Sequence, residues 1–391
     1  MTTEITSGQR LTEIAAPSSP APETGTITPE HRKVLAGALV GTTIEWFDFF
    51  IYAQAAGLIF AIQFFNPATN DNPSLALIVS WASLGISFLF RPLGAIIAGH
   101  LGDRLGRKPV LVITLVGMGG ATAAIGLLPT YATIGIAAPI LLVLLRILQG
   151  LSAGGEWGGA FPQVGVPAGM LLATLFMLGM TTALSTEQFE AWGWRIPFLF
   201  SIVLIAVGFL IRRLVEESPV FAEMEQLKKK SSAPLSELFR GHWRTVLTAA
   251  VIFAGVNAAG YLAIAYFLSY GTSVLGMGRS VLLLLTSLAA VAWIIATLFF
   301  GGLSDRIGRK RTFALGYAAM IAWAIPTWLL IDTANPLLFG VAVVILGTLL
   351  GITYGPQPAL YAEMFPASVR LSGVSISYAI GSIIGGPPPP T

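Results

Sequence analysis

Ten long apolar runs dominate the sequence and restrict how the chain can fold. Each is close to the roughly 20 residues that a helix needs to cross the hydrocarbon core of a bilayer. Only 10% of the residues are charged, whereas soluble domains carry about 25%, so the chain has too few charges to cover a soluble surface. The sequence therefore predicts an all-α, polytopic membrane protein. The runs cover residues 34–64, 74–98, 110–128, 136–158, 161–184, 194–214, 245–268, 281–300, 312–331 and 337–359.

The segments outside these runs suggest the organisation of the chain. Residues 1–33 are polar and are expected to form a disordered cytoplasmic tail. We expect an N-terminal transmembrane bundle of helices 1–6 at 34–214, a cytoplasmic linker at 215–244, and a C-terminal transmembrane bundle at 245–391. An eleventh run begins near Ser372 and meets four prolines at 387–390, which cannot continue a helix. The second bundle is therefore expected to hold helices 7–10 and only part of helix 11.

The basic residues predict how the chain is oriented. Of the 22 Lys and Arg residues, 18 fall in segments on the same side as the N-terminus, and only Arg195 and Arg279 fall on the other side. Cytoplasmic loops carry such an excess, so the N-terminus is expected in the cytoplasm. Because these charges occupy short loops between apolar runs, they indicate a lipid bilayer rather than a nucleic acid as the partner of the chain.

A ten-residue phrase occurs twice. It reads GHLGDRLGRK at 99–108 and GGLSDRIGRK at 301–310, and seven of the ten positions match. Each copy lies between two apolar runs, which predicts a tight hairpin in each of two related halves. We expect Gly301 and Gly302 to end one helix and Asp305 to cap the next. Two near-identical copies with an embedded acid indicate a shared switching device.

Four charged residues lie deep inside the apolar runs, away from their ends. Glu45 and Asp48 are three residues apart on one helical face, and Arg91 and Arg146 lie at similar depths in other runs. A charge in a bilayer costs at least about 2.5–3.5 kcal/mol unless it is paired or hydrated, so we expect the four to face one polar site. Two interpretations remain open: static ion pairs between helices, or proton binding by Glu45 or Asp48. The predicted charge network comprises Glu45, Asp48, Arg91, Arg146 and Glu156.

The second half has no ionisable residue deep in a run, so neutral polar groups are its candidates for a substrate cavity. A stripe at helical spacing on the run 136–158 adds further candidates from the first half. The predicted cavity residues are Trp46, Phe49, Tyr52, Gln149, Trp157, Asn257, Tyr261, Tyr354 and Gln357.

The two repeated phrases, 99–108 and 301–310, resemble the signature loop of the major facilitator superfamily, which follows helices 2 and 8. Its metabolite:proton symporter branch resembles this chain at Glu45–Phe49, Arg91–Gly94, Arg146–Gly150, Gly154–Gly159, Gly193–Phe198, Glu217–Phe221 and Glu363–Pro366. The resemblance implies alternating access, with proton symport of an organic acid or zwitterion across the cytoplasmic membrane. The chain departs from the family in lacking a polar loop between helices 4 and 5 and the C-terminal helices. The resemblance also implies that residues of the two repeated phrases form a cytoplasmic gate. These residues are Gly99, Asp103, Arg104, Gly106, Arg107, Lys108, Asp305, Arg306, Gly308, Arg309 and Lys310.

Other functions are weighed against symport. A drug exporter is one alternative, although the run 161–184 lacks the glycine-proline motif of such antiporters. A non-transporting sensor or an inactive fragment is another, favoured by the shortened end. The chain has no cysteine and only three histidines, His31, His100 and His242, so an enzyme, a bound metal or a cofactor is not expected. The expected partners are a small-molecule substrate and a proton, and the expected state is a monomer.

Overall fold

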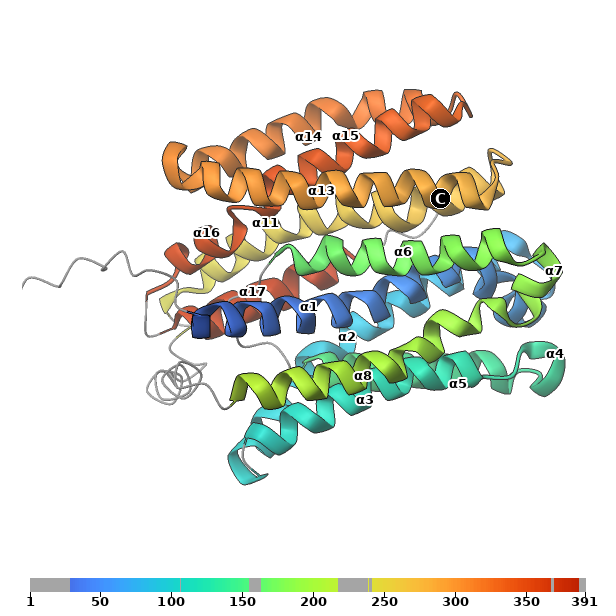
Figure 1. Ribbon diagram of the computed structural model, residues 1–391, viewed down its shortest axis with the longest axis horizontal. Coiled ribbons are helices and arrows are strands. Elements are labelled where there is room, and N and C mark those ends of the chain that lie inside the picture. The colour runs from blue at the N-terminus through green and yellow to red at the C-terminus, as the bar shows by residue number, and fades with distance from the viewer. Residues whose placement is uncertain are drawn as a thin grey trace, which may run out of the picture.

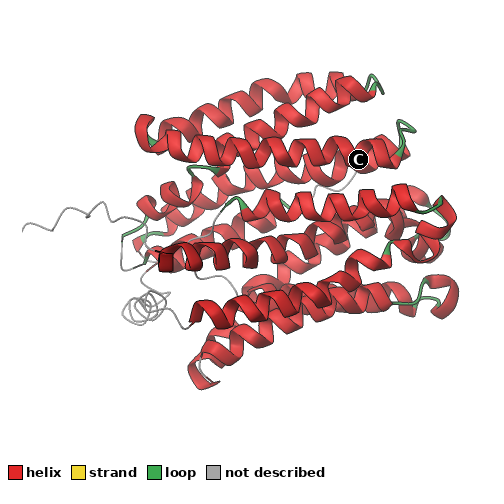
Figure 2. Ribbon diagram, viewed as in Figure 1, coloured by secondary structure: helices red, strands yellow, loops and turns green. Residues whose placement is uncertain are grey.

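The computed structural model describes residues 29–105, 107–154, 163–216, 238, 241–366 and 369–386, and every regular element in these ranges is a helix (Figure 2). This confirms the all-α prediction. The elements of the first half are α1 Pro29–Ala55, η1 Ala56–Phe65, η2 Pro67–Thr69, α2 Pro73–Leu105, α3 Arg107–Leu127, α4 Tyr131–Ile134, α5 Ala137–Gly154, α6 Gly165–Ala183, α7 Thr186–Gln188, η3 Phe189–Gly193 and α8 Arg195–Glu216. Those of the second half are α11 Trp243–Tyr261, η4 Leu262–Tyr266, α12 Phe267–Ser273, α13 Arg279–Ile307, α14 Arg309–Ile331, α15 Pro336–Tyr354, α16 Gln357–Met364 and α17 Arg370–Ile384.

Within the described residues, the predicted apolar runs are mainly helical, although some of them comprise more than one helical element. In the part of the chain that the structure describes, eight helices are long and apolar enough to cross a membrane, and the bent pair Thr186–Gly193 and Arg195–Ile211 makes a ninth candidate. Two shorter apolar helices, Val112–Leu127 and Gly373–Ile384, accompany them. The last of these ends just before Gly385, as the sequence predicts.

Two bundles of helices lie side by side. In the first, α1 packs on α6 and α8, α2 on α5, and α3 on α5 and α8; in the second, α15 packs on α13 and α14, and α11 on α17. The bundles meet where α13 contacts α6, α17 contacts α2, and η4 contacts α1. Both repeated hairpins and the start of α1 lie at one end, on the left of Figure 1, and α4 and α7 lie at the other. We call these the hairpin end and the α7 end.

The outer surface is apolar, as a lipid-facing surface requires. On α14, Ile321, Ile325 and Leu329 are each at least 67% exposed and recur at intervals of four residues, so they form one stripe along the helix. Such a continuous exposed apolar face is stable only against lipid or another apolar surface.

Glycines bring α2 and α5 into backbone contact. A Cβ added at Gly150 would collide with the carbonyl of Ser87, and one added at Gly154 would collide with the carbonyl of Arg91. Close crossing through small residues is typical of helix pairs in membranes. This crossing brings Arg91 of α2 close to the backbone of α5, the helix that carries Arg146.

Two predicted boundaries are wrong. Gly301 and Gly302 do not end a helix, because α13 continues to Ile307 and breaks only at Gly308, whose φ of +95° is unfavourable for a residue with a side chain. The run 337–359 is not one helix, because the chain turns at Gly355 and Pro356 between α15 and α16. The connection between the predicted runs 136–158 and 161–184 falls outside the described residues.

Candidate functional site

Glu45 and Arg91 form a buried ion pair between α1 and α2. The Glu45 Oε1 and Arg91 Nη2 atoms are 3.5 Å apart, and the two side chains are 3% and 7% exposed. The guanidinium of Arg91 also lies over the ring of Phe88, 4.8 Å from its centroid, and 5.8 Å from the centroid of Phe49. A charge pair that is buried among aromatic rings depends strongly on both partners, since losing one leaves an uncompensated buried charge.

Asp48 makes its hydrogen bonds to two other helices. Its Oδ2 accepts a hydrogen bond of 3.0 Å from the hydroxyl of Thr122 on α3, and its Oδ1 accepts one of 2.5 Å from the hydroxyl of Ser201 on α8. Asp48 is 1% exposed. Its carboxylate is therefore held inside the first bundle by hydroxyl donors.

A chain of hydrogen bonds connects Asp48 with Arg146. The amide nitrogen of Gln149 donates to Thr122 Oγ1 over 3.0 Å, and Arg146 donates to the amide oxygen of Gln149. Arg146 also donates to the backbone carbonyl of Leu84. The predicted stripe on α5 thus faces the bundle interior, with Arg146 fully buried and Gln149 4% exposed.

Aromatic rings hold the two arginines together. Arg146 lies 3.9 Å from the ring centroid of Tyr52, whose hydroxyl hydrogen-bonds Ser83 at 2.6 Å. Arg146 is also 5.5 Å from the centroid of Phe49, the same ring that Arg91 approaches. Both arginines therefore meet at Phe49, with Glu45 paired to Arg91. Asp48 joins Arg146 through the hydrogen bonds of Thr122 and Gln149. Trp46 packs edge-on to Phe49, with the ring centroids 5.6 Å apart.

The second bundle places Tyr261 against this site. The ring of Tyr261 is 5.7 Å from Phe49 and 5.8 Å from Phe88, measured between centroids. Tyr354 packs edge-on to Trp293 at 4.8 Å. Tyr261 thus extends the aromatic rings around the ion pair into the second bundle, where Trp293 and Tyr354 form an aromatic pair of their own.

The remaining predicted cavity residues have other positions. Asn257 donates to the backbone carbonyl of Gly385, so its amide joins α11 to the end of α17. Gln357 is buried at the first position of α16. Glu156 and Trp157 lie outside the described residues.

Tyr317 enters the backbone of a neighbouring helix. Its hydroxyl accepts a hydrogen bond of 3.1 Å from the Val256 N–H and donates to the Ile252 carbonyl. In a regular helix these two backbone groups bond to each other across one turn. A side chain of α14 therefore takes part in the hydrogen bonding of α11.

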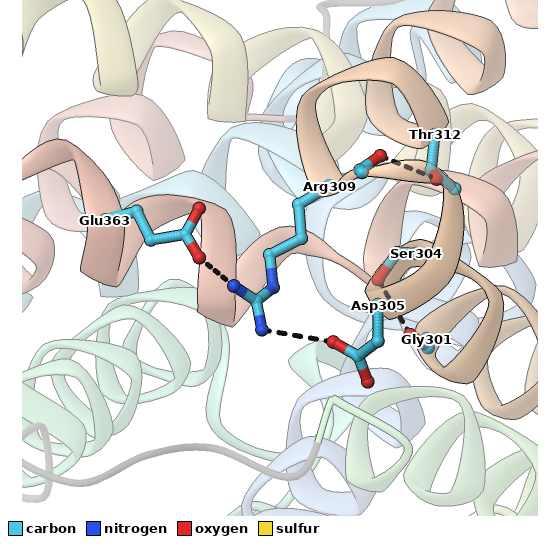
Figure 3. Close-up of polar contacts among 7 residues, drawn as sticks. Gly301, Ser304, Asp305, Arg309, Thr312 and Glu363 are labelled. Atoms are coloured by element: carbon cyan, nitrogen blue, oxygen red, sulfur yellow. Dashed lines mark hydrogen bonds and ion pairs between the residues drawn. The ribbon is translucent and has the colours of Figure 1, made fainter. Parts of the chain in front are cut away.

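At the hairpin end, the second repeated phrase forms an ion-pair cluster (Figure 3). Arg309 of α14 pairs with Asp305 of α13 at 3.1 Å and also with Glu363 of α16. Asp305 therefore binds a side chain rather than capping the next helix as predicted. Arg306 and Lys310 are exposed. In the first copy, the following lie outside the described residues: Gly106, the surroundings of Gly99, and the side chains of Asp103, Arg104, Arg107 and Lys108.

At the α7 end, polar contacts join the two bundles. Arg279 of α13 pairs with Glu190 of η3 at 3.0 Å, with the side chains 28% and 37% exposed. Ser280 donates to Thr181 of α6. At the α7 end, these contacts connect η3 and α6 of the first bundle with α13 of the second.

Several of these residues are absent from the predicted set. Thr122 is one of two threonines in the run 110–128, and Ser201 is the one serine in the run 194–214. Nothing in their spacing points to Asp48. Glu363 carries a stronger signal, because it follows an apolar run that ends on the same side as the basic hairpins. An exposed acid beside a basic loop is a natural ion-pair partner.

Comparisons with known proteins agree with this geometry. Residues 38–387 match the family model of the Major Facilitator Superfamily. The chain is 39% identical over 379 residues to the inner membrane metabolite transport protein YhjE of Escherichia coli K12, covering 91% of this chain and 85% of that protein. It is 34% identical over 390 residues to the shikimate transporter of Escherichia coli K12, covering 94% and 88%. The crystal structure of a D-xylose-proton symporter has the same fold, with a TM-score of 0.72 at 18% identity over 90% of this chain and 88% of that one.

Proposed function

This chain belongs to the major facilitator superfamily of membrane transporters, and we propose that it carries a small polar metabolite, an organic acid or a zwitterion, across the cytoplasmic membrane together with a proton. The relatives reported above are transport proteins rather than enzymes. The observation that carries the coupling is the buried Glu45–Arg91 ion pair at the junction of the two bundles.

Glu45 is the proposed proton site. When a proton neutralises the Glu45 carboxylate, the Arg91 cation loses its counter-ion in a region from which water is largely excluded. An anionic group of the substrate then replaces that counter-ion. The proton and the substrate thus depend on each other, because Arg91 pairs with either the ionised acid or the substrate.

Charge balance supports this scheme. The ionised Glu45 with Arg91 has no net charge, and so has the protonated Glu45 with Arg91 and a bound anion. Moving a net charge through a bilayer is costly, so both the empty and the fully loaded carrier can change conformation. Arg91 with a proton on Glu45 but no substrate carries a net positive charge and is disfavoured.

Asp48 has a positioning role in this proposal. Its two hydroxyl donors and its connection to Arg146 through Thr122 and Gln149 occupy the carboxylate within the first bundle. We propose that this series of hydrogen bonds fixes α1 against α3, α5 and α8, so that the Glu45 side chain is positioned beside Arg91.

The test is uptake into proteoliposomes with an imposed pH gradient, using shikimate, proline and glycine betaine as probes. The wild type is expected to accumulate at least one probe when the outside is acidic. Glu45→Gln is expected to exchange that probe across the membrane without gradient-driven accumulation. Glu187→Gln, the same substitution at an exposed acid of α7, is the matched control and should keep its response to the gradient. Gradient-driven accumulation by Glu45→Gln would contradict the proposal.

The orientation and the gate are parts of the same proposal. The 18 basic residues on the N-terminal side support a cytoplasmic hairpin end. The Asp305–Arg309–Glu363 cluster is the proposed second-half gate, which stabilises one conformation through contacts between α13, α14 and α16. A single cysteine introduced at Arg306, in a chain that has none, should react with an impermeant thiol reagent only from the cytoplasmic side.

A further inference from the structure

Six side chains of the second bundle contain buried polar atoms without a hydrogen-bond partner among the described residues: Tyr261, Ser269, Trp293, Thr297, Arg309 and Gln357. Three of these groups adjoin the charged site: the Tyr261 hydroxyl, the Trp293 indole nitrogen and the Thr297 hydroxyl. The residues are 3%, 1% and 3% exposed. Most buried polar atoms in folded proteins have a partner, so three unpartnered atoms in one region need an explanation.

Equivalent groups nearby have partners. On α13 itself, Thr286 and Ser287 donate to the carbonyls of Leu282 and Leu283 one turn earlier. Thr297 lies on the same helix and makes no such bond. Its hydroxyl is therefore not used by its own helix, although helix geometry would allow it.

The same contrast holds for tryptophan. On α14, the Trp323 indole nitrogen donates to the Ala342 carbonyl of α15. The indole nitrogen of Trp293 on α13 has no acceptor in the described part of the chain, although its residue is more deeply buried.

The three groups adjoin the charged site. Trp293 and Thr297 are one turn apart on α13, and the Trp293 ring lies 4.0 Å from a Cβ built at Gly260. Gly260 precedes Tyr261, whose ring packs on Phe49 and Phe88. Those two rings lie beneath Arg91. These contacts run from Arg91 through the rings of Phe49, Phe88 and Tyr261 to the face of α13 that carries Trp293.

The aromatic faces of the site already hold cations. Arg91 occupies Phe49 and Phe88, and Arg146 occupies Tyr52 and Phe49. Quaternary ammonium ligands are recognised by open aromatic faces. Here such a ligand would have to displace a guanidinium from a ring, and its cation would lie close to the positive charges of Arg91 and Arg146. The site is therefore unfavourable for a quaternary ammonium group.

We infer that the substrate is a hydroxylated carboxylate, whose carboxylate binds Arg91 and whose hydroxyl groups bind Tyr261, Trp293 and Thr297. This inference rests on the proposed function, and it selects the organic acids over the zwitterions. A hydroxyl group both donates and accepts, so it can serve the indole N–H as well as the two protein hydroxyls.

Binding is measured on the purified full chain in detergent, by the shift of the thermal unfolding midpoint with probe concentration. The probes are 3,4,5-trihydroxycyclohexanecarboxylate against cyclohexanecarboxylate, and gluconate against hexanoate. Glycine betaine and xylose test a zwitterion and a neutral sugar. At least one hydroxylated acid should bind about 10-fold or more tightly than its unhydroxylated partner, because each added hydrogen bond contributes about 2- to 10-fold.

Variants that remove only a hydroxyl test the assignment. Tyr261→Phe and Thr297→Val should each weaken binding of the hydroxylated acid by about 2- to 10-fold and leave the unhydroxylated acid unchanged. Thr286→Val is the matched control on the same helix, since its hydroxyl already bonds to Leu282, and it should bind both acids as the wild type does.

The outcomes separate this inference from the proposed function. Equal binding of hydroxylated and unhydroxylated acids, tighter binding of glycine betaine or xylose, or no binding of any probe would overturn the inference. Gradient-driven uptake can still succeed in those cases. Conversely, preferential binding of a hydroxylated acid without any response of uptake to the pH gradient would support the inference and overturn proton coupling.

Discussion

The ion pair between Arg279 and Glu190 joins the two bundles at the α7 end, and its removal should loosen that end by a measurable amount. Both side chains are about one-third exposed. A pair of this exposure contributes about 0.5–1 kcal/mol, which corresponds to a factor of about 2–5 in a conformational equilibrium. Arg279→Gln should therefore increase the population open at the α7 end by about 2- to 5-fold.

A cysteine at Ser269 reports this opening. Ser269 lies on α12 of the second bundle, is 3% exposed, and its Cβ would be 3.1 Å from a Cβ built at Gly57 of η1 in the first bundle. Because the chain has no cysteine, Ser269→Cys is the single labelling site. Its reaction rate with an impermeant maleimide should follow the open population.

The charge reversal Glu190→Arg with Arg279→Glu should return labelling to the rate of the Ser269→Cys parent. Arg311→Gln, an exposed arginine at the opposite end that is not part of the predicted gate, is the control and should leave labelling unchanged. Raising the salt concentration should speed labelling of the parent but not of Arg279→Gln, because salt screens only an intact pair. Equal labelling rates in the parent and in Arg279→Gln would refute the reasoning.

Three further substitutions test the packing and the gate. Gly150→Ala should lower the free energy of unfolding by about 1–3 kcal/mol, because its methyl group collides with the backbone of α2; Gly120→Ala, with open space around its Cβ, is the control in thermal unfolding. Thr122→Val should cost about 1.5–3 kcal/mol in the same assay, since it removes a hydroxyl donor from the carboxylate of Asp48. Asp305→Asn weakens the hairpin ion pair and should slow turnover in proteoliposomes while leaving substrate affinity unchanged; lost affinity with normal turnover would show a role in binding instead.

The helices were predictable because lipid leaves few alternatives to apolar runs of about 20 residues. The stripe that carries Arg146 and Gln149 was predictable for the same reason, since helical spacing alone places both on one face. Helix ends were less predictable. Glycine permits a helix to end but does not force it, so α13 runs through Gly301 and Gly302 and stops at Gly308.

The partners of the buried charges could not be read from spacing. Glu45 and Asp48 share a helical face, yet Glu45 pairs with Arg91 and Asp48 bonds to Thr122 and Ser201. That choice depends on how α2, α3 and α8 are rotated around α1. The rotation follows from contacts between backbones, such as the glycine crossing of α2 and α5, which involve residues far apart in sequence.

The hydroxyl of Tyr317 connects the movement of α14 to the backbone of α11. The helix α14 starts at the ion-paired Arg309, and two turns later its tyrosine holds the carbonyl of Ile252 and the amide of Val256. Helices bend where a side chain enters their backbone hydrogen bonds. A tilt of α14 at the hairpin end thus pulls on α11 little more than one turn before Tyr261. The helix α14 and the hydroxyl of Tyr317 thus connect the ion-pair cluster at the hairpin end with the part of α11 that precedes Tyr261.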